Sequence, residues 1–223
     1  MTEGAIPPPL PHERLFAGGN ELIWGERRPR IAKEDLPKGW QDIEPHPWRR
    51  YFARQLDTAI SGLIAEVALL WGLAAIDPEL GGRVAQILST AALPFQTIII
   101  VALAVIPNAL ILGLSGSSLG KWIFGIRVLK RNGKPIGVFR ALVREIRVLV
   151  MGLGLGIPLI SLITLIGSYM GLSEKGATGW DRAMENVVAQ RRNHFGQIVL
   201  SMLGIGFYVA LLLGLVALTR ATR

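Results

Sequence analysis

Four ionisable residues in and just before the first long apolar stretch have types and spacing suited to binding chemistry. Arg50, Arg54, Asp57 and Glu66 fall within residues 50–75, RYFARQLDTAISGLIAEVALLWGLAA. On a continuous helix Arg50 and Asp57 share one face two turns apart, and Arg54 lies close to it. An acid at the centre of a transmembrane helix costs roughly 2.5–3.5 kcal/mol on insertion scales. The pattern predicts either a ligand or ion site here, or a structural pair of Arg54 with Asp57 and a Glu66 that is protonated or paired.

The surrounding stretch is long enough to cross a bilayer. Residues 56–76 exceed the roughly 20 apolar residues that a spanning helix needs. The chain is 51% hydrophobic and only 18% charged, whereas a soluble domain carries about 25% charged residues. Further apolar stretches cover residues 91–114, 148–173 and 195–218. The expected fold is therefore an all-α membrane protein, a bundle of about four transmembrane helices.

Composition also excludes several function classes. The chain has no cysteine, and its three histidines are scattered without metal-ligand spacing. No pair of nucleophile and base stands out, so we expect no enzyme, no cofactor and no metal site. The net charge of +8 indicates contact with anionic headgroups of the lipid bilayer. No compact basic domain stands apart from the apolar stretches, which argues against nucleic-acid binding.

The distribution of charge and proline gives an expected organisation. Residues 1–45 form a Pro-rich tail without a signal-peptide pattern, so the N-terminus should be cytoplasmic. The chain would then be a multi-pass protein of the plasma (bacterial inner) membrane. A short loop at 76–83 is poor in basic residues and should lie outside. In the second span, Pro94 and Pro107 should kink the helix, while Asn108 should face other helices.

The segment 115–147 carries the strongest positive-inside signal. Residues 124–136 predict a short cytoplasmic β-hairpin, because Asn132-Gly133 is a favoured two-residue turn. From Val138 the pattern predicts a basic amphipathic helix in the membrane interface. Three arginines of this helix would contact lipid headgroups: Arg140, Arg144 and Arg147.

The apolar stretch 148–173 allows two topologies. By length it is a third span, and residues 174–194 would then lie outside. Its centre reads GLGLGIP, so it can instead be a broken or re-entrant helix, which would put 174–194 inside. The charges of 174–194 do not decide between the two.

The residues quoted so far, with a few further ones, resemble the RDD family of membrane proteins. The family's first-helix element R-x-x-A-R-x-x-D is matched by residues 50–57, and its T-x-G-K-x-x-x-G-x-x-V element by 118–128, with Ser118 in place of threonine. An A-L-x-R pattern is matched by 141–144, and T-x-x-D by 178–181. Order and spacing agree over residues 46–190. The turn before Val187 departs from the family pattern, and residues 195–218 form an additional C-terminal helix outside the resemblance.

The resemblance implies a triad of one arginine and two aspartates, which here are Arg50, Asp57 and Asp181. It also implies transport of a ligand that the family name does not specify. Our first functional hypothesis is therefore transport of an ion or small solute through a site at Asp57 and Glu66 with Arg50. The alternative is a non-transporting scaffold or regulator that binds anionic lipid or a partner protein. Four spans are few for a transporter, so a homo-oligomer is a further expectation.

Overall fold

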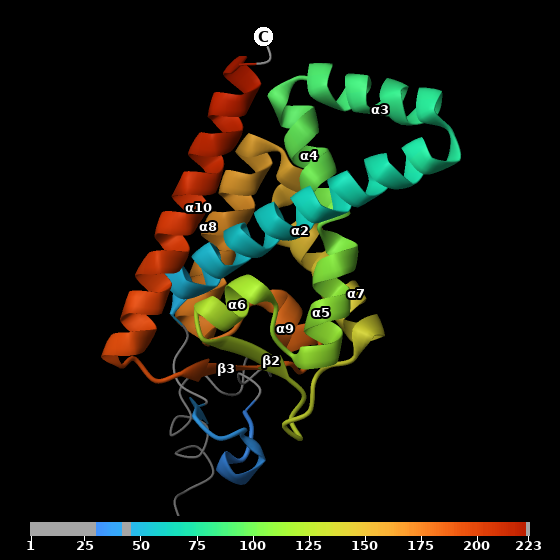
Figure 1. The fold of residues 1–223 in the computed structure, drawn as a ribbon. Coiled ribbons are helices and arrows are strands. Elements are labelled where there is room, and N and C mark those ends of the chain that lie inside the picture. Colours follow the sequence, from blue (N-terminus) through green and yellow to red (C-terminus); the bar gives the residue numbers. More distant parts are fainter. Residues whose placement is uncertain (1–29, 42–45, 222–223) are drawn as a thin grey trace, which may run out of the picture.

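The computed structural model describes residues 30–41 and 46–221, and these form a mostly helical structure with a small sheet at one end (Figure 1). Of the predicted tail 1–45, residues 1–29 and 42–45 lie outside the described residues. The long helices are α2 (Pro47–Ile76), α3 (Pro78–Thr90), α4 (Leu93–Leu103), α5 (Val105–Ser115), α7 (Val138–Met151), α8 (Pro158–Lys175) and α10 (Phe195–Ala221). The short elements are η1 (Lys33–Asp35), α6 (Leu119–Ile123), η2 (Gly154–Gly156), α9 (Gly179–Ala183) and the strands β1 (Trp40–Gln41), β2 (Ile126–Leu129) and β3 (Val187–Arg191).

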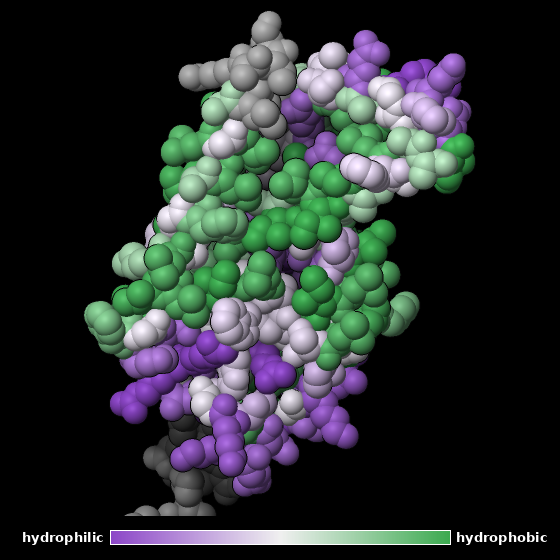
Figure 2. Space-filling view, viewed as in Figure 1, coloured by the Kyte–Doolittle hydropathy of each residue, from purple (hydrophilic) through white to green (hydrophobic). Residues whose placement is uncertain are grey.

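Three helices of the described residues are long and apolar enough to cross a membrane. They cover Pro47–Ile76, Pro94–Ser115 and Phe195–Ala217. The apolar side chains of one face of the molecule gather in a belt between two hydrophilic ends (Figure 2). About four spanning helices were expected, and the described residues contain three candidates. The difference lies in residues 148–173.

Residues 148–173 do not form one helix. Helix α7 ends at Met151, and the backbone turns through Gly154, Leu155 and Gly156, which all have positive φ. Pro158 then begins α8. Because β2 precedes α7 and β3 follows α9, and because the two strands pair, the chain leaves the sheet and returns to it. The glycines therefore act as the breaking point that the re-entrant alternative requires.

The sheet has the antiparallel order β1-β3-β2. Val128 of β2 lies opposite Val188 of β3, so residues 60 positions apart in the chain hold the end of the molecule together. The predicted hairpin at 124–136 is wrong in its second strand, which is reduced to a single bridge between Leu129 and Pro135. Asn132-Gly133 does form a turn, with Gly133 at φ 73°. Strand β2 instead uses the distant β3 because β3 offers it a buried apolar partner.

One other local prediction needs correction. The loop expected at 76–83 is the start of helix α3, because the Asp77 carboxylate accepts hydrogen bonds from the backbone N–H groups of Glu79 and Leu80 and so caps the helix. The second span is interrupted at Ala104, between α4 and α5. That break comes three residues before Pro107, as expected for a proline that leaves a carbonyl unpaired.

Helix α7 has the amphipathic pattern predicted from the sequence, but one residue of its basic stripe, Arg144, lies inside the protein. The apolar Phe139 and Ile146 are exposed, whereas Arg144 and Glu145 are buried. A buried arginine is stable here because carboxylates meet it inside the protein. The helix packs mainly along α5. A side chain at Gly113 of α5 would collide with the backbone of Val138.

Candidate functional site

A core of apolar side chains beneath the sheet positions the polar residues. Leu56 of α2, Leu112 of α5, Phe124 and Val128 are almost fully buried against one another. This packing fixes the first three turns of α2 against α6 and β2. The polar residues of α2 then emerge on one side of the core, since positions 50, 54, 57 and 61 recur at helical spacing.

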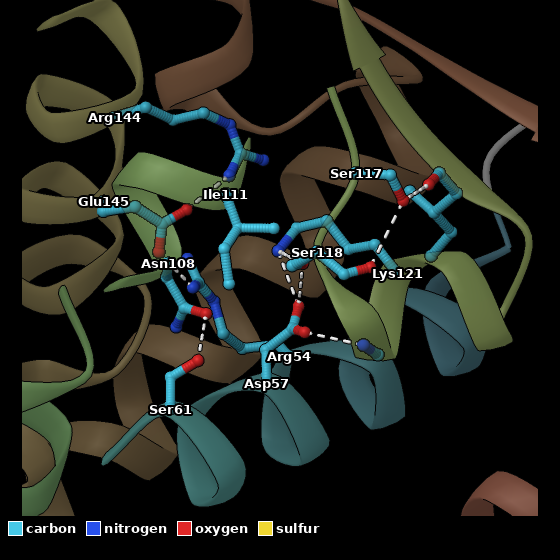
Figure 3. A network of polar contacts seen from close by, with 12 residues as sticks. Arg54, Asp57, Ser61, Asn108, Ile111, Ser117, Ser118, Lys121, Arg144 and Glu145 are labelled. Carbon is cyan, nitrogen blue, oxygen red and sulfur yellow. Dashed lines mark hydrogen bonds and ion pairs between the residues drawn. The ribbon is translucent and has the colours of Figure 1, made fainter. Parts of the chain in front are cut away.

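The first group of polar contacts surrounds Asp57 (Figure 3). Its carboxylate accepts a hydrogen bond from the backbone N–H of Gly120 at 2.7 Å and forms an ion pair with Lys121 at 2.7 Å. The Ser118 hydroxyl also donates to it, and Lys121 donates to Ser118 at 2.7 Å. All four residues are buried. Asp57 therefore anchors the start of α6, where a side chain on Gly120 would lie 2.5 Å from the Ala53 carbonyl oxygen.

The second group joins α2 to α7 and α9. Arg54 forms an ion pair with Glu145, and Glu145 also accepts from Arg144 at 3.1 Å (Figure 3). Arg144 binds Asp181 through two nitrogens, at 2.8 and 3.3 Å. Arg50 lies 3.7 Å from the same carboxylate. We call the residues of both groups the buried charge network: Arg50, Arg54, Asp57, Lys121, Arg144, Glu145 and Asp181.

A hydroxyl and an amide extend these contacts. Thr178 donates to Asp181 at 2.8 Å, so that carboxylate is bound from two helices and the loop before α9. Further along α2, Ser61 donates to the side-chain oxygen of Asn108 at 2.8 Å (Figure 3). Asn108 is almost fully buried, as its predicted role in helix contacts requires.

Opposing charges outweigh burial at the acids outside the spanning helices. Burial raises the pKa of Glu145, but the cations Arg54, Lys121 and Arg144 bring that pKa down to about 2. Burial likewise opposes ionisation of Asp181, and Arg144 together with Arg50 nevertheless lowers its pKa. Both acids are therefore ionised at neutral pH.

The two buried cations differ. Burial lowers the pKa of Lys121 and is only partly offset by Asp57 and Glu145. Burial also acts against Arg144, yet Asp181 and Glu145 raise its pKa above the ordinary value. Of these two cations, Lys121 is thus the one whose charge is less supported by its surroundings.

A pocket of about 350 Å³ borders the network between the start of α2 and the second half of α8. We call it the α2–α8 pocket. Arg50, Arg54, Lys121, Arg144 and Asp181 contribute to its polar part. Its other walls come mainly from apolar side chains of α8, β2, β3 and α7. A small molecule in this pocket would touch the network directly.

The structure brings together four of the five residues predicted for a ligand or ion site. Arg50, Arg54, Asp57 and Asp181 all belong to the buried charge network. Glu66 does not, because nine helical residues separate it from Asp57 by about 13.5 Å along α2. Glu66 is half-buried, and no polar partner for it occurs among the described residues.

The three arginines predicted for lipid headgroups lie in different surroundings. Arg140 is half-buried and donates to the backbone carbonyl of Met184. Arg147 is half-buried on the same helix. Arg144 is buried and its guanidinium is bound to Asp181 and Glu145, so it cannot serve a headgroup at the surface. That assignment of Arg144 needs correction, because carboxylates inside the protein satisfy it.

Sequence reasoning missed Glu145 and Lys121 as members of the site. Glu145 is the one acid among the eight basic residues of 115–147, and a lone acid in a basic segment is a usable signal for a buried pair. Lys121 belongs to the glycine-lysine element quoted above, where the lysine had no partner assigned. Across the described residues, no group of three potential His, Cys, Asp or Glu ligands is placed to hold a metal ion.

Three long apolar helices, an apolar belt and a network of buried ion pairs define a helical protein of membrane type. The model of the RDD family matches residues 44–185, so the chain belongs to the RDD family. That match covers α2 through α9 and ends just before β3, whereas α10 follows it. No curated protein and no solved structure shows a significant match to this chain.

Proposed function

We propose that the chain is a multi-pass membrane protein that transports an ion or a small solute by way of the α2–α8 pocket. The site we assign differs from the one expected from sequence, since Asp57 and Glu66 are too far apart to bind one ion together. Arg50 and Asp181 take the place of that pair. The protein would lie in the plasma (bacterial inner) membrane.

The observation that carries this proposal is the contact between Arg50 and Asp181. The two residues belong to the buried charge network and also line the pocket. Their separation of 3.7 Å is longer than the contacts of Arg144 to the same carboxylate. A charged solute in the pocket would compete with Arg50 or Asp181 for its partner. Loss of that contact would alter the ion pairs that Arg144 forms with Asp181 and Glu145.

The orientation follows from the basic residues at the sheet end. Lys130, Arg131 and Lys134 extend from that end, while α3 at the opposite end carries Glu79 and a single basic residue, Arg83. The positive-inside rule then favours a cytoplasmic sheet and N-terminus.

Three candidate spans are few for a transporter, so we also expect a homo-oligomer, which light scattering of the purified protein would measure.

The test is flux in liposomes that contain the purified protein, with a panel of ions and small solutes. We expect Arg50→Gln to reduce flux at least tenfold without loss of folding, because Arg144 still neutralises Asp181. Arg147→Gln makes the same change on α7 outside the pocket and should leave flux unchanged. Equal flux in wild type and Arg50→Gln, or no flux of any tested solute in wild type, would contradict the proposal.

The completeness of the ion pairing favours a second candidate, a non-transporting scaffold or regulator. Every acid of the buried charge network meets a cation, an arrangement that can serve helix packing alone. Arg140 and Arg147 would then add contact with anionic lipid or a partner. This candidate predicts lost expression for Asp57→Ala, recovery in the double variant Asp57→Asn with Lys121→Gln, and no flux in any assay.

A further inference from the structure

The charge that lines the α2–α8 pocket is strongly one-sided. Four cations and one acid face it: Arg50, Arg54, Lys121, Arg144 and Asp181. The single acid is already bound by Arg144 and Thr178 and lies 3.7 Å from Arg50. Asp57 and Glu145, which balance the charge elsewhere in the network, are not among the lining residues. The polar part of the pocket therefore favours an anion.

Two of these cations are the accessible ones. The side chains of Arg50 and Arg54 keep 15% and 14% of their surface exposed, against 7% for Lys121 and 8% for Arg144. Arg50 and Arg54 lie one turn apart on α2. A carboxylate or phosphate group suits such a pair, because guanidinium groups bind both in a forked geometry.

The rest of the pocket is mainly apolar. Its walls include Val148 of α7, Leu165 and Leu172 of α8, and Ile126, Val128 and Val188 of the sheet. No charged side chain of α8 lines the pocket, although Gln55 of α2 and Ser168 of α8 offer uncharged polar groups. A small inorganic anion would leave these apolar walls without a partner.

The rim of the pocket reaches the outer surface. Trp48 of α2 is 70% exposed, and Ile166 and Tyr169 of α8 are each 53% exposed. Tryptophan and tyrosine are the residues enriched where a membrane meets water. An apolar tail can therefore leave the pocket along α8 toward the belt of apolar side chains while its headgroup stays at the arginines.

We propose that the α2–α8 pocket binds an amphipathic anion, with a carboxylate or phosphate headgroup at Arg50 and Arg54 and an apolar tail along α8. The volume of about 350 Å³ lies within the range of small-molecule pockets, roughly 300–1,000 Å³. The proposed ligand is also the class of solute that the proposed function would transport. Only its movement across the membrane rests on that function. Binding itself requires only the pocket.

The test measures binding to the full-length protein in neutral detergent by native mass spectrometry. The probes are phosphatidylglycerol against phosphatidylcholine with the same chains, and oleate against oleyl alcohol. We expect wild type to retain one molecule of an anionic probe at least tenfold more than its uncharged or zwitterionic counterpart. Retention of phosphatidylglycerol alone assigns the ligand to bilayer lipid, and retention of oleate alone assigns it to a free amphiphile.

Two isoleucines of α8 provide matched variants that leave every ion pair intact. Ile166→Trp fills the rim of the pocket, whereas Ile163→Trp adds the same bulk at an exposed position that does not line it. We expect Ile166→Trp to lower retention at least tenfold and Ile163→Trp to match wild type. Arg50→Gln should lower retention of the anionic probes without affecting the uncharged ones.

Equal retention of anionic and uncharged probes, or equal retention by the two tryptophan variants, would overturn the inference. Flux in liposomes is measured separately. Binding without flux would reject the transport function and support the proposed ligand class. Flux of other solutes without binding of these probes would support transport and reject the proposed ligand class.

Discussion

The guanidinium of Arg144 donates two hydrogen bonds, at 2.8 and 3.3 Å, to the carboxylate of Asp181, which lies 37 residues further along the chain. The first residue lies on α7 and the second on α9. Between them the chain turns at η2 and returns along α8. This pair therefore joins the two ends of the segment formed by α7, η2, α8 and α9. Arg50 of α2 lies near the same carboxylate.

We expect Asp181→Ala to destabilise the protein strongly. The change leaves Arg144 buried without its main carboxylate, and removal of one partner of a buried pair costs about 3–5 kcal/mol. Thermal unfolding in detergent would show a large drop in Tm. The exposed pair of Arg131 and Glu185 supplies the control, since Glu185→Ala should cost no more than about 1 kcal/mol. Equal effects of the two variants would refute a stabilising role for Asp181.

The stability of the protein should fall below about pH 4.5 because of Glu145. Its pKa is about 2 in the folded protein and near the ordinary 4.5 when unfolded. A lowered folded pKa stabilises the protein above pH 4.5, and this contribution is lost as the pH falls from 4.5 toward 2. The loss is on the order of 3 kcal/mol at 1.36 kcal/mol per pKa unit.

Melting curves between pH 7 and pH 3 would test this dependence. Asp181, whose pKa is also lowered, adds a loss in the same direction. Glu145→Gln cannot titrate, so its Tm should start lower at pH 7 and decline less on acidification. A variant profile parallel to that of wild type would show that Glu145 does not contribute to the acid sensitivity.

Gly120 should tolerate no side chain. A methyl group there would lie 2.5 Å from the Ala53 carbonyl oxygen and 2.9 Å from an oxygen of Asp57. We expect Gly120→Ala to push α6 away from α2 and to cost about 1–3 kcal/mol, as overpacking does. Gly167→Ala on α8 meets open space and should leave the Tm unchanged or slightly higher. An unchanged Tm in Gly120→Ala would contradict the close approach of the two helices.

Cysteine labelling would test the return of the chain after η2. The native chain has no cysteine, so single exposed sites can be introduced one at a time. We expect Glu185→Cys and Lys134→Cys to react from the same side of the membrane, because β2 and β3 belong to one sheet. Glu79→Cys on α3 should react from the opposite side. Labelling of residues 185 and 134 from different sides would exclude the paired strands.

The helices and their polar face could be predicted from the sequence better than the contacts between them. The spacing of Arg50, Arg54 and Asp57 placed these residues on one face of α2, because helical periodicity is local. The glycines of GLGLGIP marked a breakable point, but the direction of the chain beyond it depends on a strand pair that is distant in sequence. Hence the two topologies of 148–173 could not be separated.

The partners of the charged residues were the least predictable part. One of the two alternatives paired Arg54 with Asp57, which is near it in sequence, yet Arg54 pairs with Glu145 on α7. Asp57 pairs with Lys121 instead. Local spacing favours the nearest opposite charge, whereas the fold brings α6 and α7 against α2 and offers buried partners there. The burial of Arg144 on α7 has the same origin, since its partner Asp181 lies 37 residues further along the chain.

The order β1-β3-β2 puts the last strand to be synthesised in the middle of the sheet. Among the described strands, β1 and β2 have no partner until residues 187–191 have left the ribosome. Helix α2 can meet α6 through Asp57 and Lys121 well before that time, whereas Arg50 must wait for Asp181. Assembly of this protein during translation therefore has two stages. The contact of Asp57 with Lys121 forms in the first, and the pocket is completed in the second.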